Sequence, residues 1–377
     1  MDFQLTEDQR AFADMAQSLF ADYCSDDQLR AHDTSGAPYQ QALWQQCVAA
    51  GLHGITVPEE HGGLGLGMTE LMAVLEQQGR ALALVPLWEQ QLAAATLARF
   101  GCAALQPALA ALMAGEIAAV SLAGLAQSRG CTLRLARRVD GWILQGSSPA
   151  VPLAAAARHA LLVAQAEDGP RLVWLALDAA GITRTPGQSQ HHQEIADLQF
   201  DGVALAGDAV LPTAAIAWLE PRAIAALASI QLGVTAEQLR RTVAYVSERK
   251  QFDRPIGSFQ LVAGQMADGH IALEALRSSL WQLVYRLDAG LELRLRRQGR
   301  PVFRDDDPVL VEFEQLDLVT AGRSAQDETD GWILVCLAFV TVQPLQVEVH
   351  LPLIVRLELP DLQFHCNQPT QRPGVEQ

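Results

Sequence analysis

A short basic and aromatic stretch in the second half of the chain carries the residues best suited to chemistry. Arg249, Lys250 and Arg254 lie within six positions of one another, in a chain whose net charge is −16. Phe252 lies between them, and Gln260 follows where a helix is expected to begin. Cations, the free N–H groups of a helix N-terminus and a flat aromatic ring suit a phosphate-bearing cofactor. The alternative is a polar loop that only joins two helices.

Two long helices are expected to hold this stretch between them. Apolar residues recur at spacings of three and four from about Ala214 onward, and again over residues 261–287. The first helix should end before Pro255, which lacks an N–H group and restricts the residue before it. Gly257 is expected to give the turn its freedom, and Ser258 to cap the second helix.

The glycine-rich stretch 51–67 is a second candidate for close contact with a ligand. Its glycines allow a tight turn in which the backbone approaches another group. A phosphate-binding loop would need a strand before it and a helix after it, or a Gly-Lys-Ser/Thr ending, and neither is present. The residues alone therefore favour a structural turn between helices. Thr69 is expected to cap the helix that follows.

Other reactive residue types are scattered, and no metal site is predicted. The six cysteines have neither metal-ligand nor redox spacing. His191 and His192 are adjacent, so their side chains would point to opposite faces of a strand. The three aspartates at 305–307 are interpreted as a charged loop.

The strongly acidic composition argues against nucleic acid and anionic membranes as partners, because binding to phosphate groups needs a basic face. The longest apolar run, residues 332–342, is too short to span a bilayer. The N-terminus lacks the basic and apolar regions of a signal peptide. Together with the cysteine pattern, these features favour a cytoplasmic protein.

Four regions are predicted along the chain, in an α+β arrangement. Helical periodicity over 1–115 indicates an N-terminal helical domain, in which Thr6 and Gln9 form a capping box. Short apolar segments broken by Asp-Gly pairs indicate a β-barrel-like middle domain over 116–211, with hairpin turns at Val139-Asp-Gly and Glu167-Asp-Gly. Residues 212–290 form a C-terminal helix bundle, and 291–377 are a divergent tail.

Two motifs resemble the acyl-CoA dehydrogenase family. The first is Glu248-Arg-x-x-Phe-x-x-Pro-Ile-x-x-Phe-Gln260, and the second is Val57-Pro-Glu-Glu-His-Gly-Gly-Leu-Gly65. The resemblance covers about residues 5–290. The order of the predicted regions along the chain, helical, then β, then helical, is similar to that of the family. The segment from Trp142 to Pro152 looks more like the branch that acts on bulky or steroid side-chain acyl-CoAs.

The resemblance implies an FAD-dependent α,β-dehydrogenation of an acyl-CoA thioester. A carboxylate removes the α-proton, and hydride leaves the β-carbon for the flavin. Arg249, Phe252 and Gln260 match the family residues that contact FAD from the neighbouring subunit. The loop 57–65 would lie near the substrate cavity. An electron-transferring flavoprotein is the implied electron acceptor.

Three departures from the family pattern affect the expected activity. The flavin-contacting motif of the family should lie near Val120, where the chain reads Ser121-Leu-Ala-Gly-Leu-Ala-Gln-Ser-Arg-Gly130. One class of the family places the catalytic glutamate where this chain has Ala223, and Glu220, one helical turn earlier, is the candidate base. The alternative, which the residues alone favour, is that Glu220 is an exposed acid near the start of the helix, ahead of Pro221. The bundle is incomplete relative to the family, because the late Glu-Gly-Thr motif of the other class does not occur after residue 290.

These departures leave three interpretations open. The first is an active acyl-CoA dehydrogenase. The second is a non-catalytic partner that binds a sibling subunit and donates one face of its FAD site. The third is a decayed, truncated homologue. The helices over 214–250 and 258–287 are expected to form the interface of a dimer or tetramer.

Overall fold

The computed structural model describes residues 5–126, 132–189 and 192–291, together with four short strands farther along the chain. Helices dominate its first third. The predicted capping box is confirmed, because Gln9 N donates to Thr6 Oγ1 at 3.2 Å and Thr6 N donates to Gln9 Oε1 at 3.0 Å. The helices and 3₁₀ turns of this part are α1 (Glu7–Tyr23), α2 (Asp26–Ser35), α3 (Gln41–Ala49), η1 (Leu52–Gly54), η2 (Glu59–His61), α4 (Met68–Ala81), α5 (Leu87–Phe100), η3 (Ala103–Leu105) and α6 (Gln106–Met113).

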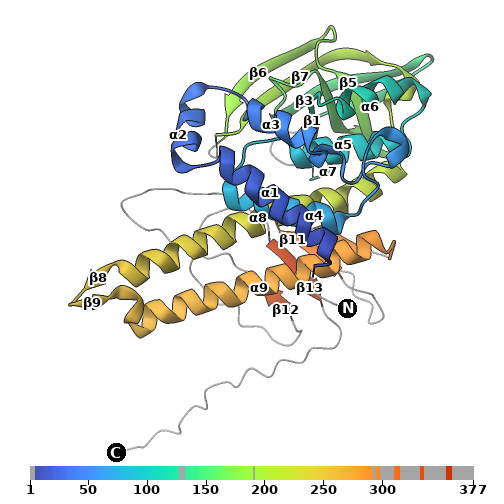
Figure 1. Cartoon of the computed structure of the whole chain (residues 1–377). Helices are drawn as coiled ribbons and strands as arrows, with labels where there is room; N and C mark the ends of the chain where they lie inside the picture. Colours follow the sequence, from blue (N-terminus) through green and yellow to red (C-terminus); the bar gives the residue numbers. More distant parts are fainter. Residues whose placement is uncertain are drawn as a thin grey trace, which may run out of the picture. The chain divides into compact units, whose positions relative to one another are not determined.

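The middle of the chain forms a curled mixed sheet of seven strands (Figure 1). The strand order is β1-β4-β2-β3-β7-β6, with β5 also paired to β4. β1 and β2 run parallel to β4, and the remaining pairs are antiparallel. The elements are β1 (Ala118–Ser121), α7 (Ala123–Ala126), β2 (Arg134–Arg138), β3 (Gly141–Pro152), β4 (His159–Ala166), β5 (Gly169–Ala176), β6 (Ile182–Gln188), β7 (Glu194–Leu205) and η4 (Gly207–Ala209).

The two predicted hairpin turns of this sheet are confirmed. Arg138 pairs with Gly141 across the β2–β3 turn, and Ala166 pairs with Gly169 across the β4–β5 turn. Each leaves two residues in the loop, which is the length that an Asp-Gly turn favours. The sheet is a half-barrel, because its strand order is an open path whose ends do not pair with each other. The α+β class and the β-barrel-like middle are thus confirmed.

Two long helices, α8 (Ala214–Glu248) and α9 (Gln260–Asp288), follow the sheet and pack side by side (Figure 1). α8 also packs against α4 and α5, so it belongs to the same hydrophobic core as the N-terminal helices. Pro221 lies inside α8, which continues through it. Between the two helices lie β8 (Lys250–Gln251), β9 (Arg254–Pro255) and the 3₁₀ turn η5 (Ile256–Ser258).

The described residues up to Leu291 form one compact unit, and four short strands belong to a second. These strands form a sheet in the order β10-β11-β13-β12, in which β10 and β11 are parallel. They are β10 (Arg294–Arg297), β11 (Leu310–Glu314), β12 (Trp332–Leu334) and β13 (Ile354–Glu358). The aspartates at 305–307, His191, and residues 127–130 of the segment 121–130 discussed above lie outside the described residues. No helix in the described part is long and apolar enough to cross a membrane.

Candidate cofactor and substrate site

The joint between α8 and α9 is a tight two-residue hairpin. Lys250 pairs with Pro255 and Gln251 with Arg254, so Phe252 and Asp253 form the turn. Both turn residues have positive φ, 52° and 61°, the backbone conformation of the hairpin turns that match strand twist. The Phe252 ring is 87% exposed at the tip of the hairpin. A large apolar ring held in solvent by a strained turn is suited to contact another molecule.

Two expectations for this joint were wrong. Ser258 does not cap the second helix, because Phe259 occupies the N-cap position and the Ser258 hydroxyl instead donates to the Pro255 carbonyl at 2.7 Å. Gly257 is not the residue with positive φ. Its role is close approach, since a Cβ there would lie 3.0 Å from the Val246 carbonyl oxygen. The left-handed conformation falls on Phe252 and Asp253 instead.

Around this hairpin, the predicted cofactor-binding residues are all exposed. Arg249 follows the last residue of α8, and Gln260 is the first residue of α9. Arg254 places its guanidinium 4.1 Å from the centre of the Phe259 ring, and the Phe252 ring meets the same ring edge-to-face at 6.2 Å. The joint therefore brings cations, a pair of aromatic rings and the N-terminus of a 29-residue helix to one end of the α8–α9 pair (Figure 1). That donor set fits the pyrophosphate and ring system of FAD.

The glycine-rich loop closes on itself. Leu64 N donates to Gly54 O at 2.9 Å, Leu66 N to Ile55 O at 2.9 Å, and Gly65 N to Val57 O at 2.8 Å. These bonds join the two limbs of the loop. Gly63 is required by close approach, because a Cβ there would lie 2.1 Å from the Val57 carbonyl oxygen. The side chains at the tip, Pro58, Glu59 and Glu60, are exposed.

The candidate base Glu220 lies in the second turn of α8 and is half-buried. Ala223, at the position where one class of the family keeps its glutamate, is only 2% exposed. Because α8 continues through Pro221, Glu220 and Ala223 lie on neighbouring parts of one helix face. Arg222 stacks on Trp218 at 4.2 Å, and burial lowers the pKa of its guanidinium to about 10. The sequence reasoning did not identify this arginine.

A buried acid on α5 was also missed. The Glu89 side chain is only 1% exposed. Gln193 Nε2 donates a hydrogen bond to Glu89 Oε1 at 3.3 Å. The other carboxyl oxygen, Glu89 Oε2, has no hydrogen-bond partner among the residues that the structure describes. Burial raises the pKa of this carboxyl to about 8. The signal in the sequence was the run Glu89-Gln-Gln91 inside a long apolar stretch, since charged residues are rarely buried without a reason.

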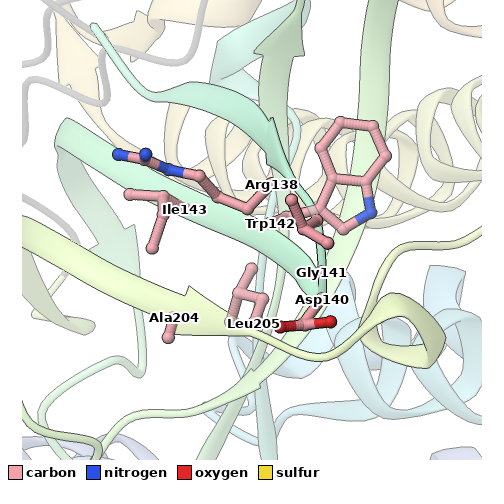
Figure 2. Close-up of a pocket in the computed structure, with 8 residues that line it drawn as sticks. Arg138, Asp140, Gly141, Trp142, Ile143, Ala204 and Leu205 are labelled. Carbon is pink, nitrogen blue, oxygen red and sulfur yellow. The ribbon is translucent and has the colours of Figure 1, made fainter.

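A shallow cavity of about 360 Å³ lies at the β2–β3 hairpin (Figure 2). Its lining is mainly apolar, with one positive and one negative side chain, and it contains none of the predicted site residues. The lining residues are Arg138, Val139, Asp140, Gly141, Trp142, Ile143, Ala204 and Leu205. The predicted site residues do not meet within one chain. Arg249, at the C-terminal end of α8, and Glu220, near its start, are separated by roughly 40 Å of helix at 1.5 Å per residue.

Comparisons with known proteins identify the family of the chain. A model of the acyl-CoA dehydrogenase N-terminal domain matches residues 6–123, and a model of the acyl-CoA dehydrogenase C-terminal domain matches residues 222–299. The acyl-CoA dehydrogenase FadE27 of Mycobacterium tuberculosis is 31% identical over 76% of this chain and 78% of that protein.

Two solved structures have a similar fold and similar sequences. A variant of the Tcur3481–Tcur3483 steroid acyl-CoA dehydrogenase is 35% identical with a TM-score of 0.70, over 75% of this chain and 79% of that one. The ChsE4–ChsE5 complex from Mycobacterium tuberculosis is 30% identical with a TM-score of 0.72, over 77% and 80%. Since the two family models together span more than half of the sequence, the chain belongs to the acyl-CoA dehydrogenase family of FAD-dependent oxidoreductases.

Proposed function

We propose that this chain works in the α,β-dehydrogenation of a bulky acyl-CoA thioester, with Arg249, Phe252 and Gln260 contacting FAD that is shared with a second subunit. The observation that carries the proposal is the exposed joint between α8 and α9. Its cations and its 87% exposed phenyl ring face away from the chain's own core. Residues that serve a cofactor across a subunit interface would have this exposure in a single chain.

In the proposed reaction the protein orients the acyl-CoA and removes its α-proton. FAD, when bound, supplies the acceptor for the hydride from the β-carbon. The α-proton must go to a carboxylate within hydrogen-bonding reach, and Glu220 is the proposed group. The glycine-rich loop 57–67 is proposed to border the acyl-CoA, where its closed backbone leaves room for close approach.

A bulky, steroid-like acyl group is proposed as the substrate class. The support is the name of one similar structure, a steroid acyl-CoA dehydrogenase, together with the resemblance of residues 142–152 to that branch. An electron-transferring flavoprotein is the proposed acceptor of the electrons. We place the reaction in the cytoplasm, because the cysteines Cys24, Cys47 and Cys102 are free thiols.

A second candidate is a partner subunit without its own base. Ala223 favours it, because an alanine at the position where one class of the family keeps its glutamate cannot abstract a proton. One similar structure is a complex of two different named chains, ChsE4 and ChsE5. In this interpretation the joint completes the FAD site of a sibling that supplies the carboxylate.

The test is to purify the chain, record its absorbance spectrum, and mix it anaerobically with straight-chain, branched and steroid acyl-CoAs. Flavin bands that bleach with the chain alone support the dehydrogenase. Bleaching that needs an added sibling subunit supports the partner. A colourless protein that neither binds added FAD nor restores a sibling would reject both and favour a decayed homologue.

A further inference from the structure

The N-terminus of α4 is capped by a side chain from the far end of α9. Met68 N donates to Asp288 Oδ1 at 2.7 Å, and Thr69 N donates to Asp288 Oδ2 at 3.0 Å. The Thr69 hydroxyl also donates to Asp288 Oδ2, at 2.6 Å. Both carboxylate oxygens are thus bonded to the first turn of a helix that lies 220 positions earlier in the chain. Asp288 is the last residue of α9.

The absence of a side chain at Gly67 leaves space for the Asp288 carboxylate. A Cβ at Gly67 would lie 2.7 Å from the three carboxyl atoms of Asp288, so another residue there would push the carboxylate away. Gly67 has no side chain to cap α4 itself, and its N–H is bonded to Glu70 Oε2 at 3.0 Å. Asp288 supplies the charge-assisted acceptor that an N-cap side chain would normally supply.

This contact falls where the glycine-rich loop ends. The loop limb 63–66 runs directly into Gly67 and α4. The other limb is bonded to α5, because Gln91 Oε1 accepts from Thr56 N at 3.1 Å and Gln91 Nε2 donates to Leu52 O. The loop is therefore fixed at one limb by Gln91 and at the other by Asp288. Backbone bonds within the loop connect the two limbs.

We propose that Asp288 is a positioning residue for substrate binding, which holds loop 57–67 in place by joining the end of α9 to the start of α4. The substrate part of this proposal rests on the proposed function, in which the loop borders the acyl-CoA. Arg222 lies close enough to Asp288 for each charge to stabilise the other.

The experiment compares Asp288→Asn and Thr69→Val with wild type in the full chain. Asn keeps one acceptor and loses the charge; Val removes only the Thr69 hydroxyl bond and keeps the branched shape. Asp26→Asn is the matched control, because Asp26 also joins distant elements, through Arg241 of α8 at 3.1 Å, but lies away from the loop. The readouts are amide hydrogen exchange over residues 54–72, FAD content, and the affinity for octanoyl-CoA and a steroid side-chain acyl-CoA.

Asp288→Asn should speed exchange at residues 64–69 by roughly tenfold or more and weaken acyl-CoA binding by roughly fivefold or more, with FAD content unchanged. Thr69→Val should do the same to a smaller degree, and Asp26→Asn should do neither. Exchange no faster than in Asp26→Asn would overturn the proposal, as would faster exchange with unaltered acyl-CoA affinity. If Asp288→Asn does not fold, Thr69→Val decides by the same criteria.

The two proposals fail separately. A wild-type chain that binds FAD but no acyl-CoA would reject the substrate part of the proposed function. The exchange comparison needs neither ligand, so it still decides whether Asp288 holds the loop. A fall in FAD content that parallels a loss of thermal stability in both Asp288→Asn and Asp26→Asn would mark Asp288 as a general structural contact and overturn the positioning role.

Discussion

Gly79 of α4 and Gly233 of α8 lie at a helix crossing where each faces the backbone of the other helix. A Cβ at Gly79 would lie 2.0 Å from the Ile230 carbonyl oxygen, and one at Gly233 would lie 2.0 Å from the Glu76 carbonyl oxygen. No side chain separates the helices at these two glycines. The crossing sets the spacing between α4, which follows the glycine-rich loop, and α8, which carries Glu220 and ends at the joint.

We predict that Gly79→Ala or Gly233→Ala destabilises the chain by about 1–3 kcal/mol or more, because the helices must move apart. The measurement is urea unfolding followed by circular dichroism. Gly264→Ala is the control, since Gly264 is a helical glycine in α9 with no atom within 4 Å of the added Cβ. It should stabilise the chain by about 0.5–1 kcal/mol through helix propensity. Equal effects at all three positions would contradict the close crossing.

Glu89 should make the chain less stable as the pH rises. Burial raises its folded pKa to about 8, above the usual 4.5, so the folded state holds a proton that the unfolded state has lost between these values. The free energy of unfolding should therefore fall from pH 4.5 to pH 8 and change little from this group outside that window. Glu89→Gln keeps the shape and cannot ionise.

The measurement is urea unfolding of wild type and Glu89→Gln at about pH 5.5 and about pH 8, one inside and one at the top of that window. The variant should gain stability over wild type at the higher pH, by up to several kcal/mol, since each unit of pKa shift corresponds to about 1.4 kcal/mol. If the free energy of unfolding depends on pH in the same way in both proteins, the Glu89 carboxyl ionises without a cost in stability. Asp26→Asn at an exposed ion pair controls for the loss of a charge.

Local patterns predicted local structure well. The Thr6–Gln9 capping box and the turns at Val139-Asp-Gly and Glu167-Asp-Gly need only neighbours within a few positions, and each forms as expected. The long apolar periodicity likewise placed α8 and α9. The joint was located correctly between them, because proline and glycine interrupt helices whatever lies around them.

Contacts between distant segments were not predictable from these patterns. Thr69 was expected to cap α4, but it is the second residue of that helix, and the carboxylate of Asp288 takes the role of the cap. Positive φ at Phe252 and Asp253, where glycine would be expected, also depends on the strand pairing around them. The motif resemblance supplied the candidate cofactor residues, while their exposure and grouping came from the fold.

Arg249→Ala should weaken FAD binding without unfolding the chain. Arg249 is exposed at the C-terminal end of α8, and its guanidinium is proposed to make a charge-assisted hydrogen bond to pyrophosphate. Such a bond contributes about 1.5–3 kcal/mol, or roughly a 10- to 100-fold change in Kd. Fluorescence titration with FAD measures it. Arg138→Ala is the control, because Arg138 is also an exposed arginine but lies on the β2–β3 hairpin. Unchanged flavin affinity in Arg249→Ala would remove this residue from the site.

The chain should form a dimer or tetramer through α8 and α9. Ile271 is 67% exposed and Leu261 is 77% exposed on α9, and Tyr245 of α8 is 43% exposed. Apolar side chains on long helices are stabilised when a second subunit covers them. Ile271→Asp should lower the mass measured by light scattering at micromolar concentration. Val139→Asp, at a 99% exposed position on a hairpin, should leave it unchanged. A wild-type monomer at this concentration would contradict the interface.

The chain alone should dehydrogenate acyl-CoAs weakly or not at all. Removal of the α-proton needs a carboxylate within hydrogen-bonding reach, and a positioned base typically contributes a factor of about 100 to 10,000. Ala223 stands where one class of the family keeps that base, and Glu220 lies one turn away on the same helix.

The measurement is anaerobic flavin bleaching by a panel of acyl-CoAs, with wild type and Glu220→Gln compared at equal FAD content. Rapid bleaching that Glu220→Gln abolishes would reverse the prediction and make Glu220 the base. If rapid bleaching survives the substitution, the base lies elsewhere in the chain. Bleaching that appears only with a sibling subunit and is indifferent to Glu220→Gln would establish that the carboxylate comes from the partner.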